Sequence, residues 1–78
     1  MRTVTLYTRQ GCHLCEEAHA VLERAQRRVE FDLRVVDIDG DAAVRSRYDH
    51  HVPVIAIDGH DLFGGSVDED ALVARLRR

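Results

Sequence analysis

Two cysteines separated by two residues, Cys12 and Cys15, are the side chains of this sequence with the most evident chemistry. On one turn of a helix, the second sulfur lies within reach of the first. Such a pair can reduce a disulfide, because one thiolate attacks the substrate and the other thiol resolves the mixed disulfide. A crosslink between them would close a very short loop and restrain the unfolded chain little, so a purely structural disulfide is a poor explanation.

The elements expected around the pair favour this redox chemistry. Thr3–Tyr7 alternates polar and apolar residues and predicts a strand, which a glycine ends. Apolar residues then recur at helical spacing from the motif onward. Cys12 therefore lies at a helix N-terminus, where unpaired N–H groups and the helix dipole lower the pKa of a thiol. We interpret Cys12 as the nucleophile and Cys15, one turn inside the helix, as the more buried resolving thiol.

The charged neighbours of Cys12 act in opposite directions. Arg9 and a protonated His13 would stabilise its thiolate, whereas Glu16 and Glu17 would oppose it. The thiolate is therefore expected among charges of both signs.

A second strand and a short helix are predicted next. Val29–Val35 alternates apolar and polar residues, and its polar face is typical of a strand at a sheet edge. Asp39–Asp41 offers a turn and a helix N-cap, and we expect a short helix from there to about Tyr48.

A hairpin and a last helix complete the predicted elements. Val54–Ile57 and His60–Phe63 read as strands, and the Asp-Gly pair between them suits a type I′ turn. Ser66 followed three residues later by Glu69 is a capping box, which predicts the start of the last helix.

The predicted order is β-α-β-α-β-β-α, in a single domain over residues 1–78. A βαβ unit followed by a hairpin and a closing helix predicts an α/β protein with a four-stranded mixed sheet flanked by helices. This arrangement is the thioredoxin fold, and the cysteine pair falls at its first strand-to-helix turn.

Three motifs together resemble the small glutaredoxin-like branch of the thioredoxin superfamily, and the resemblance covers essentially the whole chain. The motifs are Tyr7–Cys15, His51–Val54, and Gly64-Gly65 before the last helix. The resemblance implies a thiol–disulfide oxidoreductase in which Cys12 attacks and Cys15 resolves. Thioredoxin itself is a poorer match, because its tryptophan before the motif and its Gly-Pro centre are absent.

The resemblance also implies a substrate groove. The family's proline before the third strand is cis, which would turn the backbone of Val52 toward the substrate, where it can pair like a strand. The alternative for Pro53 is an ordinary proline at a strand start.

A glutathione site is implied as well, near the Gly-Gly turn and the following helix N-terminus, with Asp68 facing the ammonium group. The alternative is a plain loop followed by a first-turn acid. Arg9 or Gln10 stands where the family usually has lysine, and His13 stands where it has proline. The predicted substrate-binding residues are Arg9, Gln10, His13, Val52, Pro53, Gly64, Gly65, Ser66 and Asp68.

Two other function classes remain open from the sequence. Cys12 and Cys15 could bind zinc with His13, His50 or His51, or could hold an iron–sulfur cluster, although no second C-x-x-C is present. The chain could also be a non-catalytic binding domain that uses the same fold.

Composition limits the partners that we expect. The 78 residues include 14 acidic and 11 basic side chains, and a formal net charge of −3 without a basic block gives no support for nucleic-acid or membrane binding. No stretch approaches the roughly 20 apolar residues of a membrane span, and the start lacks a signal-peptide core. We expect a cytoplasmic monomer without a tightly bound cofactor. Its partners would be disulfide-containing proteins and an electron donor, either glutathione or a thioredoxin-reductase-type enzyme.

Overall fold

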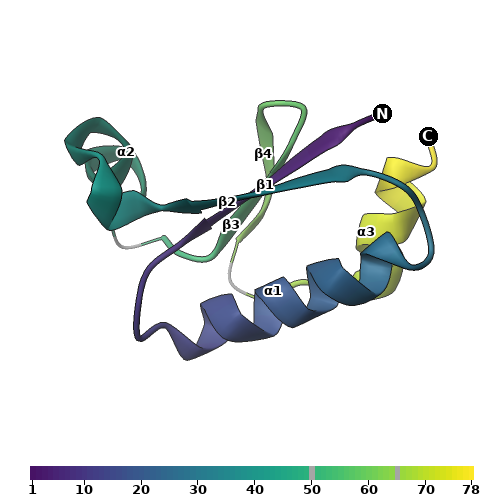
Figure 1. Ribbon diagram of the computed structural model, residues 1–78, viewed down its shortest axis with the longest axis horizontal. Coiled ribbons are helices and arrows are strands. Elements are labelled where there is room, and N and C mark those ends of the chain that lie inside the picture. Colours follow the sequence, from purple (N-terminus) through teal and green to yellow (C-terminus); the bar gives the residue numbers. More distant parts are fainter. Residues whose placement is uncertain (50, 65) are drawn as a thin grey trace.

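The computed structural model describes residues 1–49, 51–64 and 66–78, without the side chains of residues 62 and 63. The observed order of helices and strands is the predicted one, with a short 3₁₀ turn (η1) added after the second strand. The elements are β1 (Thr3–Thr8), α1 (His13–Gln26), β2 (Asp32–Asp37), η1 (Ile38–Gly40), α2 (Ala42–Tyr48), β3 (Val54–Ile57), β4 (His60–Gly64) and α3 (Glu69–Leu76) (Figure 1).

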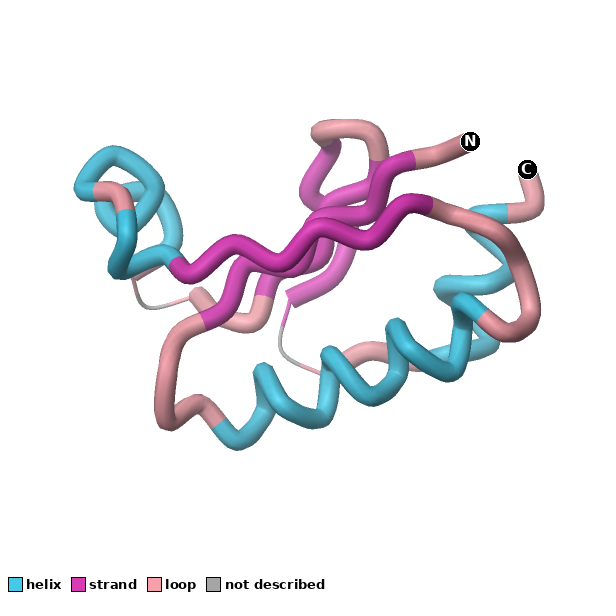
Figure 2. The backbone as a smooth tube through the Cα atoms, in the orientation of Figure 1, coloured by secondary structure: helices cyan, strands magenta, loops and turns pink. Residues whose placement is uncertain are grey.

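The four strands form one mixed sheet in the order β2-β1-β3-β4. β1 pairs with β2 in parallel and with β3 antiparallel, and β3 pairs with β4 antiparallel. The turn between β3 and β4 has positive φ at both Asp58 and Gly59, as a type I′ turn requires. The predicted thioredoxin fold is thus observed, with the strands forming one continuous layer (Figure 2).

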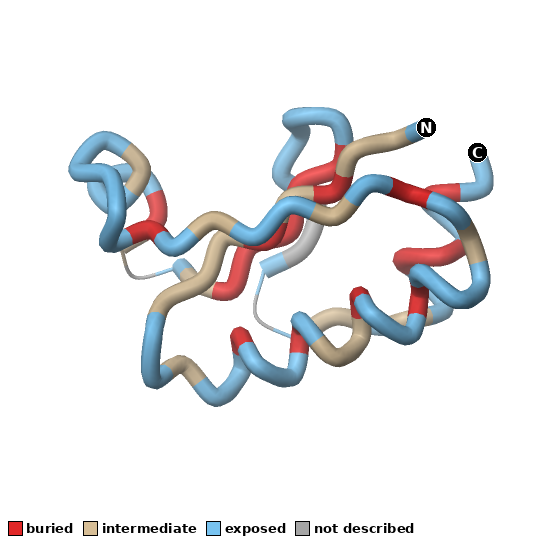
Figure 3. Tube along the Cα trace, viewed as in Figure 1, coloured by how far each residue is buried: buried red, intermediate tan, exposed pale blue. Residues whose placement is uncertain are grey.

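The main core lies between one face of the sheet and the helices α1 and α3. Val4 and Leu6 of β1 alternate toward this face, as the period of a strand dictates. Leu22 of α1 and Leu72 of α3 are 0% exposed and pack in the same cluster. Figure 3 shows this buried stripe along the strands and along the inner sides of both helices. Burial of this apolar area is the main force that holds the helices on the sheet.

The short helix α2 packs against a second, smaller cluster on the opposite side. The Tyr48 ring stacks on Tyr7 with a centroid distance of 4.2 Å, and Ile38 and Val54 pack beside them. The Tyr48 hydroxyl donates to Asp61 at 3.1 Å. Burial, and then this hydrogen bond, raise the pKa of Tyr48 to about 12. α2 is therefore fixed to the sheet by an aromatic pair and by a polar contact to β4.

The predicted bounds of the second strand, Val29–Val35, were wrong, because the strand runs over Asp32–Asp37. The second strand begins at Asp32, because its pairing with β1 starts there, so Val29 and Phe31 reach the core from the loop before it. The strand lies at the sheet edge as predicted, yet this position leaves Val35 51% exposed. The alternating apolar residues therefore begin before the strand, at Val29, and they include Val35, whose side chain stays largely exposed.

The capping box predicted at Ser66 is absent. Asp68 is the N-cap of α3 instead, and its side chain accepts the N–H of Asp70 at 3.1 Å. The carboxylate of Glu69 does not turn back to residue 66, because it accepts hydrogen bonds from Arg24 at 2.8 Å and Arg28 at 3.0 Å. Asp68 therefore caps α3 locally, while Glu69 makes long-range ion pairs with Arg24 and Arg28.

Glu69 should make the stability of the domain depend on acid pH. Hydrogen bonds from Arg24 and Arg28 hold the pKa of this carboxyl below its ordinary value of 4.5. Because the folded-state pKa is the lower one, the stabilisation is complete above the unfolded pKa and is lost as the pH falls through the folded pKa. We expect the urea midpoint of Glu69→Gln to fall less between pH 6 and pH 3 than that of the wild type.

The matched control for this prediction is Glu30→Gln, which neutralises an exposed glutamate before β2. Its acid dependence should follow the wild type. Equal acid dependence of Glu69→Gln and the wild type would show that the ion pairs with α1 contribute nothing.

Candidate functional site

The strand register brings the three sequence motifs to one end of the sheet. Thr8, the last residue of β1, pairs with Asp37, the last residue of β2. Val54, the first residue of β3, pairs with Tyr7 of β1 and with Gly64, the last residue of β4. Three segments therefore start from the same end of the sheet. They are the loop that leads to the cysteines, the segment before β3 and the segment after β4.

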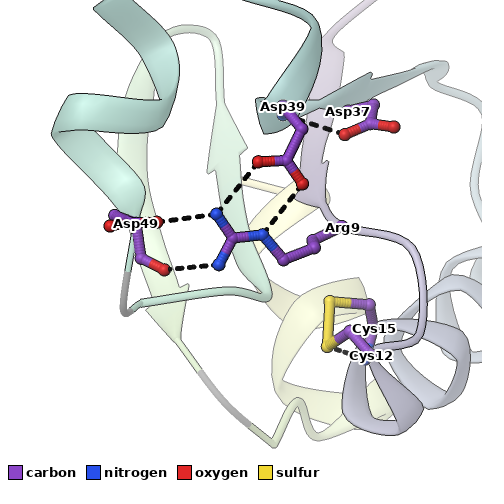
Figure 4. Close-up of polar contacts among 6 residues, drawn as sticks. All are labelled: Arg9, Cys12, Cys15, Asp37, Asp39 and Asp49. Atoms are coloured by element: carbon purple, nitrogen blue, oxygen red, sulfur yellow. Dashed lines mark hydrogen bonds and ion pairs between the residues drawn. A yellow bond between two sulfur atoms is a disulfide. The ribbon is translucent and has the colours of Figure 1, made fainter. Parts of the chain in front are cut away.

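Cys12 and Cys15 form a disulfide at the first turn of α1, with their Cα atoms 5.2 Å apart (Figure 4). Cys12 is the N-cap of the helix, and its Sγ accepts the backbone N–H of Cys15 at 3.1 Å. Its carbonyl oxygen accepts the N–H of Glu16 at 3.2 Å. The sulfur of Cys12 thus occupies the position where a helix favours negative charge.

The two sulfurs differ in exposure in the predicted direction. Cys15 is 2% exposed and belongs to the buried residues of α1, whereas Cys12 is partly exposed. A substrate disulfide can therefore approach Cys12 from solvent, while Cys15 is accessible chiefly to its partner in the motif.

The residues next to Cys12 shape the surface around it. Gly11 has φ +76°, a left-handed conformation that favours glycine, and it turns the chain into the helix. His13 is exposed, and its ring lies 3.5 Å from Glu17 and 4.0 Å from Glu16. Gln10 is an exposed turn residue. Both carboxylates that the sequence placed near the thiolate are thus beside His13.

The Arg9 guanidinium is bound by two aspartates. Its Nε and Nη2 each donate to Asp39 at 3.0 Å. Nη2 also donates to the Asp49 carboxylate at 2.6 Å, and Nη1 donates to the Asp49 carbonyl at 2.9 Å. Figure 4 shows the guanidinium pointing toward these aspartates rather than toward the disulfide. The charge of Arg9 is therefore matched by two carboxylates, and its effect on the thiolate stays a prediction.

The Val52–Pro53 bond is cis, as the resemblance implied. Pro53 is fully buried, and Val52 is half-buried against the cluster of α2. Pro53 has no N–H to donate, so the backbone before β3 presents fewer donors there than an ordinary strand would.

Of the predicted glutathione residues, Gly64 lies at the same end of the sheet as the cysteine loop, and Gly65 is outside the described residues. Asp68 precedes Glu69, which binds Arg24 and Arg28, so Asp68 lies toward the end of α1 that is opposite to Cys12. Gly64 ends β4 and is exposed, and Ser66 is exposed. Asp68 is exposed, but its carboxylate is already engaged as the helix cap. Ser66 lines an open groove of about 330 Å³ between α1 and the start of α3. The other residues that line this groove are Leu14, Glu17, Ala18, Ala20, Val21, Arg24 and Val67.

The histidines that the sequence offers as metal ligands do not form a cluster with the cysteines in the described residues. His50, one of the predicted metal ligands, lies outside the described residues. Among residues 1–49, 51–64 and 66–78, no three histidine, cysteine or acidic side chains lie close enough together to hold a metal ion. The described part of the site is a cysteine pair with charged neighbours.

A family model for the glutaredoxin-like domain (DUF836) matches residues 3–77. The chain belongs to this glutaredoxin-like family. A similar protein is the uncharacterized protein Rv0508 of Mycobacterium tuberculosis, which is 30% identical over 80 residues, covering 96% of this chain and 82% of the relative. The family, the fold and the Cys12–Cys15 disulfide together fit a C-x-x-C redox role.

Solved structures agree with the fold of this glutaredoxin-like protein. The solution structure of protein Ne2328 from Nitrosomonas europaea is 36% identical with a TM-score of 0.82, over 96% of this chain and 91% of that one. The crystal structure of protein XcR50 from X. campestris is 37% identical with a TM-score of 0.78, over 95% of both chains. A mutant thioredoxin from Halobacterium salinarum is 23% identical with a TM-score of 0.77, over 97% of this chain and 72% of that one, and shows the fold alone.

Asp39 and Asp49 are the residues near the site that sequence reasoning missed. They lie 30 and 40 residues after Arg9, so no local spacing connects the three. One signal was present, because Asp39 follows the end of β2, and the ends of parallel neighbouring strands lie at the same sheet edge. Asp49, at the end of α2, gave no such signal.

Proposed function

We propose that this glutaredoxin-like protein is a dithiol oxidoreductase that reduces protein disulfides or glutathione mixed disulfides. The observation that supports it best is the asymmetry of the cysteine pair. The partly exposed sulfur of Cys12 accepts an N–H bond at a helix N-terminus, and the buried sulfur of Cys15 is within bonding distance of it. A nucleophile must be accessible and stabilised as thiolate, and a resolving thiol needs neither.

The reaction proceeds in two exchanges. The thiolate of Cys12 attacks one sulfur of the substrate disulfide, which forms a mixed disulfide and releases the other substrate sulfur as a thiolate that takes up a proton. The Cys15 thiol then loses its proton and attacks the Cys12 sulfur, which releases the second substrate thiol and forms the Cys12–Cys15 disulfide. Two electrons pass to the substrate in each cycle, and a dithiol or two glutathione molecules must return them to the protein.

The surface around Cys12 supports an extended substrate. The cis Val52–Pro53 segment and the segment after Gly64 start from the same sheet edge as the cysteine loop. In this proposal the backbone of Val52 pairs with the substrate chain. Gly64, Gly65, Ser66 and Asp68 would hold a glutathione carboxylate and ammonium, with Gln10 and His13 at the rim of the site.

The setting proposed for this activity is the cytoplasm, where a monomer would meet reduced electron donors. None of the helices in the described ranges has the length and apolar character to cross a membrane. We propose no bound cofactor beyond glutathione as a co-substrate, and no nucleic-acid or membrane partner.

The experiment supplies NADPH to the purified protein through glutathione and its reductase, or through thioredoxin reductase, with a protein disulfide as substrate. Consumption of NADPH with either system is the expected result, because both deliver the two electrons that the cycle needs. The Cys12→Ser variant sets the background for each system.

The two donors lead to different conclusions about the site. Turnover with glutathione alone would support binding at the segment after Gly64. Turnover with thioredoxin reductase alone would make that segment an ordinary loop. Failure with both systems, from a protein whose disulfide has been shown to open in reductant, would contradict the proposed function.

A further inference from the structure

Arg9 connects three separate segments that border the cysteine pair. It follows β1 and stands three residues before Cys12. Asp39 belongs to η1, after the edge strand, and Asp49 is the C-cap of α2. One side chain therefore spans the ends of β1, β2 and α2, as Figure 4 shows. We call Arg9, Asp39 and Asp49 the arginine clasp.

The clasp leaves Arg9 little capacity to act as a ligand or as a positive charge. A guanidinium has five N–H donors, and four of them are used by Asp39 and Asp49. Two carboxylates around one guanidinium leave the clasp with a formal charge of −1. Arg9 also holds the pKa of Asp39 below its ordinary value, so both members of this pair stay charged at neutral pH. The clasp as a whole therefore brings no net positive charge to the cysteine pair.

The clasp can instead fix the separation between the loop of Cys12 and the loop of Val52 and Pro53. Asp49 stands three residues before Val52, and the N–H of His51, next to Val52, donates to the Tyr48 carbonyl at 2.9 Å. Arg9 thus connects the loop carrying Cys12 to the loop carrying Val52 and Pro53. These two loops form opposite sides of the proposed substrate groove.

We propose that Arg9 is a positioning residue, which sets the separation of Cys12 from the Val52–Pro53 segment and so the fit of the substrate chain. The inference rests on the proposed function. Geometry is the essential property, because the planar fork of arginine can bond both carboxylates at fixed angles and the point charge of lysine cannot. Lysine should therefore fail to replace Arg9.

The kinetic test compares Arg9→Lys and Arg9→Met with the wild type. We expect both variants to raise KM for a protein disulfide by about tenfold, with a smaller change in kcat, since a groove displaced by about 1 Å binds the substrate chain poorly. The pKa of Cys12, measured by the pH dependence of its alkylation, should stay within about 0.3 units of the wild type in Arg9→Lys, which keeps the charge of the clasp. Arg27→Met is the matched control, because it removes an arginine at the other end of α1.

A second readout needs no turnover and separates this inference from the proposed function. Amide exchange at His51 should be about tenfold faster in Arg9→Lys and Arg9→Met, because the end of α2 loses its anchor. If the wild type reduced no disulfide, the proposed function would fail while amide exchange would still test the clasp.

Asp49→Ala is a second variant that tests the clasp if an Arg9 variant fails to fold. It removes the side-chain contact to Arg9 and leaves the carbonyl contact, so it should move KM and His51 exchange in the same direction by a smaller amount. The double variant Arg9→Met, Asp49→Ala should be no worse than Arg9→Met alone, because the two residues act as a unit.

Two results would overturn the inference. In the first, Arg9→Lys behaves like the wild type while Arg9→Met raises the pKa of Cys12, which would make Arg9 a charge acting on the thiolate. In the second, His51 exchange and KM are unchanged in folded Arg9→Met and Asp49→Ala, which would mean that the clasp does not set the groove.

Discussion

Replacing Cys12 with serine should abolish disulfide reduction, with a loss of about a thousandfold or more in kcat/KM. A serine hydroxyl is not ionised at neutral pH and cannot form a mixed disulfide. The remaining thiol, Cys15, is only 2% exposed and cannot take over the attack. The NADPH-coupled assay measures the loss, and an unchanged melting temperature would show that the fold survives the substitution.

Cys15→Ser is the matched variant and should behave differently. Cys12 can still attack, but no thiol resolves the intermediate, so a protein substrate should stay covalently attached to Cys12. Intact-mass analysis without reductant would detect this adduct and its loss after addition of a reductant. An adduct on Cys15 of the Cys12→Ser variant, with none on Cys12 of Cys15→Ser, would reverse the assigned roles.

Replacing Leu22 with alanine should have the largest effect on stability. Leu22 is 0% exposed and packs in the cluster between α1, α3 and the sheet. Removing a buried leucine side chain costs about 2–5 kcal/mol, through lost burial and the cavity that remains. At ~0.05–0.15 kcal/mol per residue, a domain of 78 residues has a free energy of unfolding of about 4–12 kcal/mol. The variant should therefore lose a large share of this free energy, as urea unfolding would measure.

Val35→Ala is the control for the Leu22 prediction. It also truncates an aliphatic side chain, but Val35 is 51% exposed on the edge strand. Its free energy of unfolding should stay within about 0.5 kcal/mol of the wild type. A similar loss in both variants would mean that the free energy of unfolding does not follow the burial described here.

The order of elements and the place of the cysteine pair were predictable because local patterns encode them. Alternation over Thr3–Tyr7 and helical spacing after the motif needed only neighbouring residues. The same is true of the Asp58-Gly59 turn, whose backbone conformation follows from the residue types themselves. The greater burial of Cys15 followed from its position one turn into α1.

The errors arose where a distant partner outweighed a local preference. Ser66 and Glu69 have the spacing of a capping box, but Glu69 is bound by Arg24 of α1 and by Arg28, which follows the helix. Val29 has the alternation of a strand residue, but the pairing with β1 begins only at Asp32. Long-range strand pairing and ion pairing therefore changed both assignments.

The sequence by itself determined the redox pair, its position at a helix N-terminus and the mixed sheet that carries it, because residue type and spacing express these features over a few positions. Only the tertiary structure decided what Arg9 does. Its partners are 30 and 40 residues away, and they reach it because the sheet register places the ends of β1 and β2 side by side while α2 returns to the same edge. The direction of a long charged side chain is set by the carboxylates that the fold brings to it, and that arrangement exists only after folding.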